Sequence, residues 1–432
     1  MGAEVSRTKW DLLTLSLAGM MLTYVWRFQD LVLVLRPLQA VTLFSLAAVL
    51  FLVLSRDSRR RLSGLSHPVA LLVIALTVHL FVGVPFSLYP GSVLGFLRGD
   101  HVKTIALCLM IAVGVRTFAD VERLAAVLVA GFAIAALARL LTDWSSGMYD
   151  PNDDAFVAIC TLPLVFYFVQ RSTSWLAKAA FLGIVAVGIY VVIGSASRGG
   201  FLGLGAVLFY TLLRFRTLPV KVRVGAVSVL MLGAVLVGSD AYWARIATIL
   251  RPQDDYNWTG AADTGRMEIW KRGIGYMLQR PVMGVGAKNF NVAEGVLSEQ
   301  GRLQQFGEGF RWSAAHNSFV QIGAEAGMVG LVLFAGIFFF AFRGLRRASV
   351  AARRGQLHLS EGAMAEALAG CLVGYGVSGF FLSQGYSALL YVILGLIVGF
   401  LKVLPARTSR YGRPVPRSQP ASRLLHPSLR PG

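Results

Sequence analysis

Long apolar runs with almost no charged residue recur along the whole chain, and they limit its possible folds more than any other feature. A bilayer core about 30 Å thick needs about 20 apolar residues for each crossing helix. A soluble domain of 432 residues would carry more than 15% charged residues and could not bury a chain that is 56% apolar. The sequence therefore predicts an all-α polytopic membrane protein.

Twelve segments are predicted as transmembrane spans. They are centred on residues 11–27, 37–55, 68–88, 102–116, 121–141, 154–170, 176–194, 199–213, 222–239, 316–342, 363–382 and 386–402. The first follows MGAEVSRTKWD without a small-residue cleavage site, so we interpret it as a membrane anchor rather than a removed signal peptide.

The net charge of +19 is unevenly distributed among the predicted loops. With a cytoplasmic N-terminus, the clusters RDSRRR, LRFRTLPVKVR and RGLRRASVAARR and the C-terminal tail all lie inside. The outer segments then hold nearly equal numbers of basic and acidic residues. This asymmetry follows the positive-inside rule and predicts both termini in the cytoplasm. It also predicts contact with anionic membrane lipid. Nucleic-acid binding needs a concentrated basic face, and none is evident.

We divide the chain into a transmembrane domain, residues 1–402, and a basic tail, residues 403–432, whose Pro-, Arg- and Ser-rich sequence predicts disorder. Residues 239–315 form one long outer loop with short helices, and a loop of this length is usually functional. The three cysteines lie inside apolar runs and are expected to pack there as free thiols: Cys108, Cys160 and Cys371.

Two arginines lie at the predicted outer surface, where charge near a membrane indicates function. Arg198 is in a short turn, GSASRGGFLG, and snorkelling to lipid head groups is its alternative role. Arg266, in DTGRMEIWKRG, begins a predicted helix that Thr264 or Asp263 would cap, with Trp270 on the same face. An amphipathic helix on the membrane surface would also explain this second pattern.

His316 stands at the outer end of a predicted span, in RWSAAHNSFVQIGAEAGMVG. An imidazole ordinarily has a pKa near 6.5, so it can accept or donate a proton at neutral pH. A helix beginning near this histidine would bring three glycines to its face: Gly323, Gly327 and Gly330. A neighbouring helix or a slender lipid chain would fit along that stripe. Glu325 would point to the opposite side and pair within the bundle.

Several motifs are absent from the sequence: GxxxxGK[ST], HExxH, GxSxG and an outer DxD. No metal or cofactor is indicated. Two arginines and one histidine on the outer face would suit an anionic group such as phosphate beside a proton-transfer step. Secondary candidates from outer location alone are Arg98, Lys103 and Arg311.

HNSFVQIGAEAGMVG resembles the His–(Asn/Ser/Gln)–x9–Gly–x–x–Gly signature of bacterial O-antigen ligases and the wider O-antigen ligase/polymerase superfamily. Its four fixed positions are held by His316, Asn317, Gly327 and Gly330. SRGG around Arg198, GR–x3–W at Arg266 and GVGAKNF also match, and the similarity runs across nearly the whole chain.

The resemblance implies a C-type membrane glycosyltransferase that uses no metal and no nucleotide-sugar donor. Such enzymes take a glycan from undecaprenyl diphosphate at the periplasmic face of the inner membrane. They transfer it to lipid A–core, to a growing glycan or to a protein hydroxyl. By resemblance, Arg198 and Arg266 would hold the diphosphate, and His316 would act at the acceptor, as a general base or only as an orienting group.

We expect transfer to lipid A–core by direct inverting displacement. A polysaccharide polymerase and a protein O-oligosaccharyltransferase remain alternatives, because they share this chemistry. The alternative of a different class is a polysaccharide or lipid transporter that uses the arginines as a pathway. Transporters more often show internal repeats and charge at mid-membrane, whereas Glu325 is the only charge left inside a predicted span. A structural membrane protein would leave the long outer loop unexplained.

Overall fold

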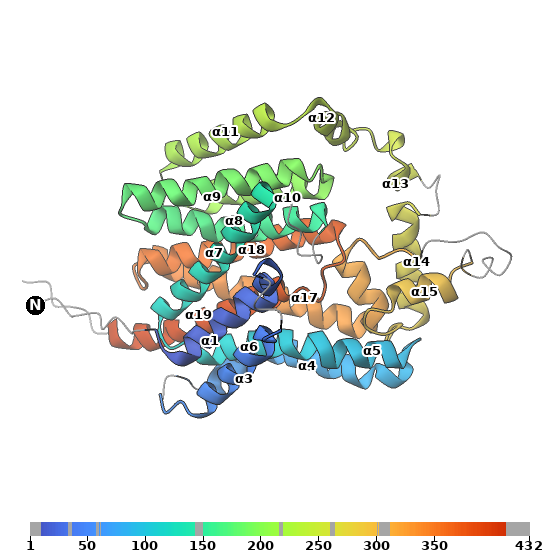
Figure 1. Cartoon of the computed structure of the whole chain (residues 1–432), viewed down its shortest axis with the longest axis horizontal. Helices are drawn as coiled ribbons and strands as arrows, with labels where there is room; N and C mark the ends of the chain where they lie inside the picture. The colour runs from blue at the N-terminus through green and yellow to red at the C-terminus, as the bar shows by residue number, and fades with distance from the viewer. Residues whose placement is uncertain are drawn as a thin grey trace, which may run out of the picture.

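The chain is built from helices packed side by side. The computed structural model describes residues 10–32, 37–57, 60, 62–142, 150–215, 219–259, 264–299, 301 and 312–411, and these residues contain no strand. The long helices run roughly along one direction, and α13, α14 and α15 gather at one end of the molecule (Figure 1).

In the N-terminal half the longer helices are α1 (Leu12–Met20), α3 (Ala40–Val53), α4 (Pro68–Val82), α6 (Val102–Gly114), α7 (Phe118–Thr142) and α8 (Pro151–Arg171). The others are α9 (Trp175–Gly194), α10 (Arg198–Arg214), α11 (Val220–Val237), α17 (Ser318–Arg353), α18 (Leu359–Ser378) and α19 (Ala388–Tyr411). Each segment predicted as a span centres on one of these helices.

Shorter helices connect them. Those before α8 are η1 (Met21–Val25), α2 (Phe28–Leu31), η3 (Leu62–Ser66), η4 (Val84–Phe86), α5 (Pro90–Phe96) and η5 (Leu97–His101). Those after α11 are α12 (Asp240–Ala247), η6 (Pro252–Asp254), α13 (Tyr256–Thr259), α14 (Arg266–Gln279), α15 (Phe290–Val296) and η8 (Gly379–Phe381). The predicted outer loop therefore contains short helices, as expected.

Five described helices are long and apolar enough to cross a membrane: Phe118–Leu141, Pro151–Arg171, Trp175–Gly194, Ser318–Arg353 and Leu359–Phe381. Four shorter apolar helices accompany them: Leu12–Val25, Ala40–Val53, Pro68–Val82 and Ala388–Leu404. The chain is thus a polytopic helical membrane protein, as predicted, while the count of twelve spans stays a prediction.

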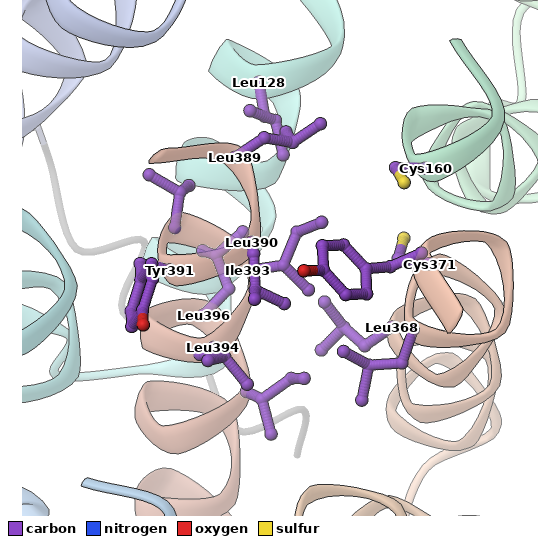
Figure 2. Packing of buried hydrophobic residues seen from close by; sticks show 14 of the residues in the cluster. Leu128, Cys160, Leu368, Cys371, Leu389, Leu390, Tyr391, Ile393, Leu394 and Leu396 are labelled. Carbon is purple, nitrogen blue, oxygen red and sulfur yellow. The ribbon is translucent and has the colours of Figure 1, made fainter. Parts of the chain in front are cut away.

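Helix α19 forms the centre of the hydrophobic core. Its residues 389–394 are all buried, which suits a helix that is apolar on every side. Figure 2 shows α19 between Leu128 on α7 and Leu368 on α18, with Cys160 and Cys371 facing one another beside it. All three cysteines are buried and free, which confirms the prediction for the thiols.

Two parts of the predicted domain division, the C-terminal tail and the long loop, are only partly covered by the described residues. Helix α19 continues to Tyr411, beyond the predicted boundary at residue 402, and residues 412–432 lie outside the described part of the chain. The loop 239–315 lacks residues 260–263, 300 and 302–311 from the description, so the candidate Arg311 also lies outside it.

Helix α17 is interrupted at Gly327, whose φ of 70° and ψ of −175° are not helical. Because of this interruption, backbone groups of residues 324–328 lack hydrogen-bond partners within the helix. Other parts of the chain supply these partners. The replacement bonds join Val285 N–H to Ala324 O (2.8 Å), Gly286 N–H to Glu325 O (2.9 Å), His79 Nε2 to Ala326 O (2.8 Å) and Met328 N–H to Pro281 O (2.7 Å). The turn 281–286 therefore docks on the helix where its backbone is open, and its bonds, with that from His79, pair these backbone groups.

The three glycines of the predicted stripe do not share one face of a continuous helix, and that prediction is wrong because of the break at Gly327. A Cβ at Gly327 would lie 2.6 Å from the carbonyl oxygens of residues 281 and 282, and one at Gly323 would lie 2.8 Å from the sulfur of Met277. Gly330 belongs to the second part of the helix. Two of the glycines thus allow close packing of the chain's own residues 277–282.

Candidate functional site

His316 lies just outside α17, with Asn317 between them as the capping residue. The backbone of His316 is left-handed, with φ of 47°, a conformation that non-glycine residues rarely adopt. The His316 N–H donates to Ser383 Oγ at 2.8 Å, and the residue is half-buried. The predicted helix start near His316 is confirmed to within two residues.

Asn317, a secondary candidate from the signature, has its side-chain oxygen occupied. This oxygen accepts from the N–H groups of Phe319 at 2.9 Å and Val320 at 3.1 Å, which have no partner within the first helical turn. Asn317 is buried. In the structure it is therefore a cap that fixes where the helix begins and, with it, the position of the neighbouring histidine.

The segment between α18 and α19 is tied to the start of α17. Ser318 Oγ donates to the Leu382 carbonyl at 2.7 Å and accepts from the Gln384 N–H at 3.0 Å. The Gly385 N–H donates to Gln321 Oε1 at 3.2 Å. These bonds place Ser383 and Gln384 beside His316. Sequence reasoning missed both residues, although the polar pair in FFLSQGYS between two predicted spans was a usable signal.

Residues 380–384 also connect the two candidate arginines with the histidine. The ring of Phe380 packs edge-on against Trp270 of α14, with centroids 5.1 Å apart. Phe381 lies against Gly199, the residue after Arg198. A Cβ added to Gly199 would be 2.7 Å from the Phe381 Cβ. Ser383 then accepts from His316. The segments that carry all three candidates therefore meet at this connection.

Arg198 is the first residue of α10, directly after its cap Ser197. Its guanidinium donates to Thr248 Oγ1 at 3.0 Å and forms an ion pair with Asp255. Burial would raise the pKa of Asp255, but hydrogen bonds from Asn257 and Arg198 hold that pKa below its ordinary value. The pair therefore stabilises the fold above the ordinary Asp pKa and loses that contribution in stronger acid. Arg198 thus turns toward Thr248 and Asp255 of the loop 239–315.

Arg266 is the first residue of α14 and is half-buried. The cap is Gly265, without a side-chain hydrogen bond, so the predicted capping by Thr264 is wrong; Asp263 lies outside the described residues. Trp270 Nε1–H donates to the Ala315 carbonyl at 3.0 Å, one residue before His316. This tryptophan is 9% exposed, so it anchors α14 on the protein and does not lie at a head-group surface.

A cavity of about 690 Å³ is lined in part by residues 383, 384 and 386–388. It is lined by hydroxyl, amide, carboxylate and cationic side chains together with aromatic rings, among them Tyr24, Arg27, Phe96, Asp100, Lys103, Asp153, Lys288, Ser383, Gln384 and Tyr386. Gln384 Nε2 donates to Asp153 Oδ1 at 2.7 Å. Because Ser383 both lines this cavity and accepts from His316, the cavity adjoins the histidine.

Lys288, in GVGAKNF, projects its ammonium group between two aromatic rings of this cavity. The nitrogen lies 5.7 Å from the ring centroid of Phe96 and 5.9 Å from that of Tyr386. The backbone N–H groups of Lys288 and Phe290 donate to the two oxygens of buried Glu325, at 2.9 and 3.3 Å. Glu325 thus pairs with the backbone of residues 288–290 and sets the position of Lys288 relative to the helix that follows His316.

Strained backbone is concentrated around this region. Positive φ is found in five described non-glycine residues: Arg27, Gln39, Ala196, Lys288 and His316. Two of them line the cavity, one is the candidate histidine, and one is two residues before Arg198. Such conformations cost about 1–3 kcal/mol each and cluster at functional sites, where the surroundings enforce them.

The two remaining cationic candidates in the described residues, Lys103 and Arg98, lie in different places. Lys103 lines the cavity, whereas Arg98 is an exposed residue of η5 that is not part of the lining. Lys288, Asp153 and Gln384 were not predicted as site residues. Their signal was too weak, because each is an ordinary polar residue whose significance depends on segments far apart in the sequence.

Comparisons with known proteins agree with the resemblance seen in the sequence. Residues 183–335 match the Wzy_C family model, described as O-antigen ligase, and this region contains Arg198, Arg266 and His316. The exopolysaccharide production protein ExoQ of Rhizobium meliloti (strain 1021) is 26% identical over 294 residues, which cover 63% of this chain and 64% of ExoQ. The match thus spans less than two thirds of that relative. The predicted resemblance is confirmed.

Proposed function

We propose that this chain, which carries an O-antigen ligase match over residues 183–335, transfers a glycan from undecaprenyl diphosphate to an acceptor hydroxyl. The reaction would take place at the periplasmic face of the inner membrane, with twelve spans, both termini in the cytoplasm and the loop 239–315 outside. The observation that carries the proposal is the position of His316. It is held in a left-handed conformation beside a polar cavity, where the segments of both candidate arginines meet.

In the proposed reaction the acceptor oxygen attacks the anomeric carbon, and the bond from this carbon to the diphosphate oxygen breaks with inversion. His316 takes the proton of the acceptor hydroxyl. Undecaprenyl diphosphate leaves, and Arg198 and Arg266 stabilise its developing negative charge. No further covalent step is needed, so positioning and electrostatic stabilisation supply most of the catalysis.

The cavity beside Ser383 is proposed to hold sugar residues next to the reacting bond. Its volume of about 690 Å³ lies within the range of small-molecule sites. Amide and carboxylate groups such as Gln384 and Asp153 can bond sugar hydroxyls, and the rings of Phe96 and Tyr386 offer flat apolar surfaces. Lys288 adds one cation that can bond a hydroxyl or an acidic substituent.

The acceptor distinguishes the related functions. Lipid A–core is the acceptor that we propose first. The printed name of ExoQ, an exopolysaccharide production protein, favours a growing polysaccharide chain as the second candidate, in which case the chain would be a polymerase. Protein O-glycosylation uses the same chemistry with a serine or threonine hydroxyl.

Glycan transfer is tested with the purified full chain in detergent and a fluorescent glycan on undecaprenyl diphosphate. Lipid A–core, a second lipid-linked glycan and a peptide are offered separately. We expect a labelled lipid A–core product. A ladder of lengthening glycans would identify a polymerase, and a labelled peptide would identify a protein glycosyltransferase. Movement of the donor across proteoliposomes without any covalent product would contradict the proposal and indicate a transporter.

Replacing Arg198 or Arg266 with alanine is expected to lower kcat/KM for the lipid-linked donor about 10- to 100-fold, since each loses a charge-assisted hydrogen bond to the diphosphate. Arg245→Ala, at an exposed arginine of α12, is the matched control and should keep full activity. Asp255→Asn separates stability from donor binding, because it breaks the Arg198 ion pair but keeps the arginine. Unchanged donor KM and turnover in both arginine variants would refute the clamp.

Lys288→Met is expected to lower kcat/KM about 10-fold or more while leaving the melting temperature nearly unchanged. The variant keeps the length of the side chain but removes its charge from the cavity. Lys271→Met serves as the control, because Lys271 is an exposed lysine of the same outer loop that pairs with Glu268. Wild-type kinetics for Lys288→Met with every glycan offered would exclude a role for this cavity in substrate binding.

A further inference from the structure

Helix α17 is longer than a membrane crossing requires. The part of α17 after the interruption at Gly327, residues 328–353, would span about 39 Å at 1.5 Å per residue, against a hydrocarbon core of about 30 Å. The helix starts beside His316, so its C-terminal third lies toward the other end of the bundle. This third therefore reaches the membrane surface opposite the candidate site.

The two faces of this C-terminal third differ sharply. One face is buried against the bundle and consists of small and aliphatic residues: Ala341, Leu345, Ala348 and Ala352. The other face is exposed and basic: Arg343, Arg346, Arg347 and Arg354. Within the described part of the chain, no hydrogen bond or ion pair is made by the guanidinium groups of these four arginines. The protein thus presents four uncompensated cations along one helical face.

A groove of about 740 Å³ follows this basic face. Apolar side chains, Phe339, Phe342, Val350 and Ala351, line it together with the four arginines. Phe339 is 58% exposed, so the apolar part of the groove is open to its surroundings.

A second cavity of about 200 Å³ adjoins the groove and shares Phe342 and Arg346 with it. It adds Arg214 of α10, Arg353, whose guanidinium donates to Ser349 Oγ at 2.9 Å, and the carboxylate of Glu366 on α18, which accepts from Ser349 Oγ at 2.9 Å. Arg346 is therefore shared by the groove on α17 and by a cavity between α17, α10 and α18 that holds two further arginines and one glutamate.

We propose that this groove binds an anionic phospholipid of the leaflet opposite His316. The lipid phosphate would contact the arginines, and an acyl chain would lie along Phe339 and Phe342. Free phosphate would leave the apolar lining unused, whereas a zwitterionic lipid would leave the positive charge uncompensated. Each basic residue near an anionic surface contributes about 1 kcal/mol. The proposal does not depend on glycan transfer.

The test uses the full chain purified in detergent and native mass spectrometry with cardiolipin, phosphatidylglycerol or phosphatidylcholine added at equal concentrations. We expect cardiolipin and phosphatidylglycerol to be retained and phosphatidylcholine to be lost. The variant Arg343→Gln/Arg346→Gln/Arg347→Gln should bind the anionic lipids roughly 100-fold more weakly. Inorganic phosphate should not compete with cardiolipin at millimolar concentration.

The matched control is Arg56→Gln/Lys178→Gln/Lys221→Gln, which removes the same charge from exposed residues on the same predicted side of the membrane. It should retain anionic lipid like the wild type. An equal loss in both triple variants would overturn the proposal and indicate only general attraction to anionic membranes. Equal retention of phosphatidylcholine by the wild type, or displacement of lipid by inorganic phosphate, would overturn it as well. The wild-type comparison remains decisive if a variant fails to fold.

Discussion

His316→Gln is expected to lower kcat for glycan transfer by about 10²- to 10⁴-fold, which is the usual contribution of a positioned general base. Glutamine can still accept or donate a hydrogen bond, but it cannot carry the acceptor proton at neutral pH. The backbone bond from residue 316 to Ser383 Oγ does not involve the imidazole, so the fold around the site should persist. The measurement is turnover of the labelled donor at saturating acceptor, with the melting temperature recorded alongside.

His316→Asn provides the control for the backbone, because asparagine tolerates the left-handed conformation at φ of 47° better than most residues. If both variants melt like the wild type and both lose turnover, the loss belongs to the imidazole. Full activity of His316→Gln would leave His316 with an orienting role only.

Gly327→Ala is expected to destabilise the chain by about 3 kcal/mol or more and to abolish transfer. A φ of 70° with a ψ of −175° is a region essentially restricted to glycine, at a cost of about 1–3 kcal/mol for other residues. The added Cβ would also lie 2.6 Å from the carbonyl oxygens of Pro281 and Val282. The turn 281–286 would have to leave the helix, and the backbone bonds it makes to residues 324–328 would be lost.

Gly205→Ala on α10 is the matched control, because nothing lies within 4 Å of the added carbon there. It should leave the melting temperature unchanged or slightly raised, since alanine favours helix more than glycine does. The readouts are thermal unfolding in detergent and donor turnover. A Gly327→Ala chain as stable and active as Gly205→Ala would show that the interruption of α17 is unimportant.

The helices themselves were predictable from local sequence. Hydropathy located each long helix, because an apolar stretch of about 20 residues satisfies its own backbone bonds wherever it packs. The start of α17 near His316 was predictable for the same local reason. The three cysteines, all within apolar runs, were correctly expected to be buried and free.

The stripe of glycines shows where this local reasoning fails. Spacing alone placed Gly323, Gly327 and Gly330 on one face, because it assumed a continuous helix. The helix is interrupted because a turn some 40 residues earlier supplies the missing bonds, such as the Pro281 carbonyl for the Met328 N–H. Local sequence contains no information about that partner.

The sequence by itself determined the class of protein, the order of its helices and the histidine signature, since these depend on hydropathy and short spacings. Tertiary structure alone decided that Arg198 pairs with Asp255, 57 residues away. It also decided that Lys288, Asp153 and Gln384 line one cavity beside His316. The physical reason is that polar groups in a membrane protein must find partners within the fold, and those partners come from whichever segments the packing of the apolar helices brings together.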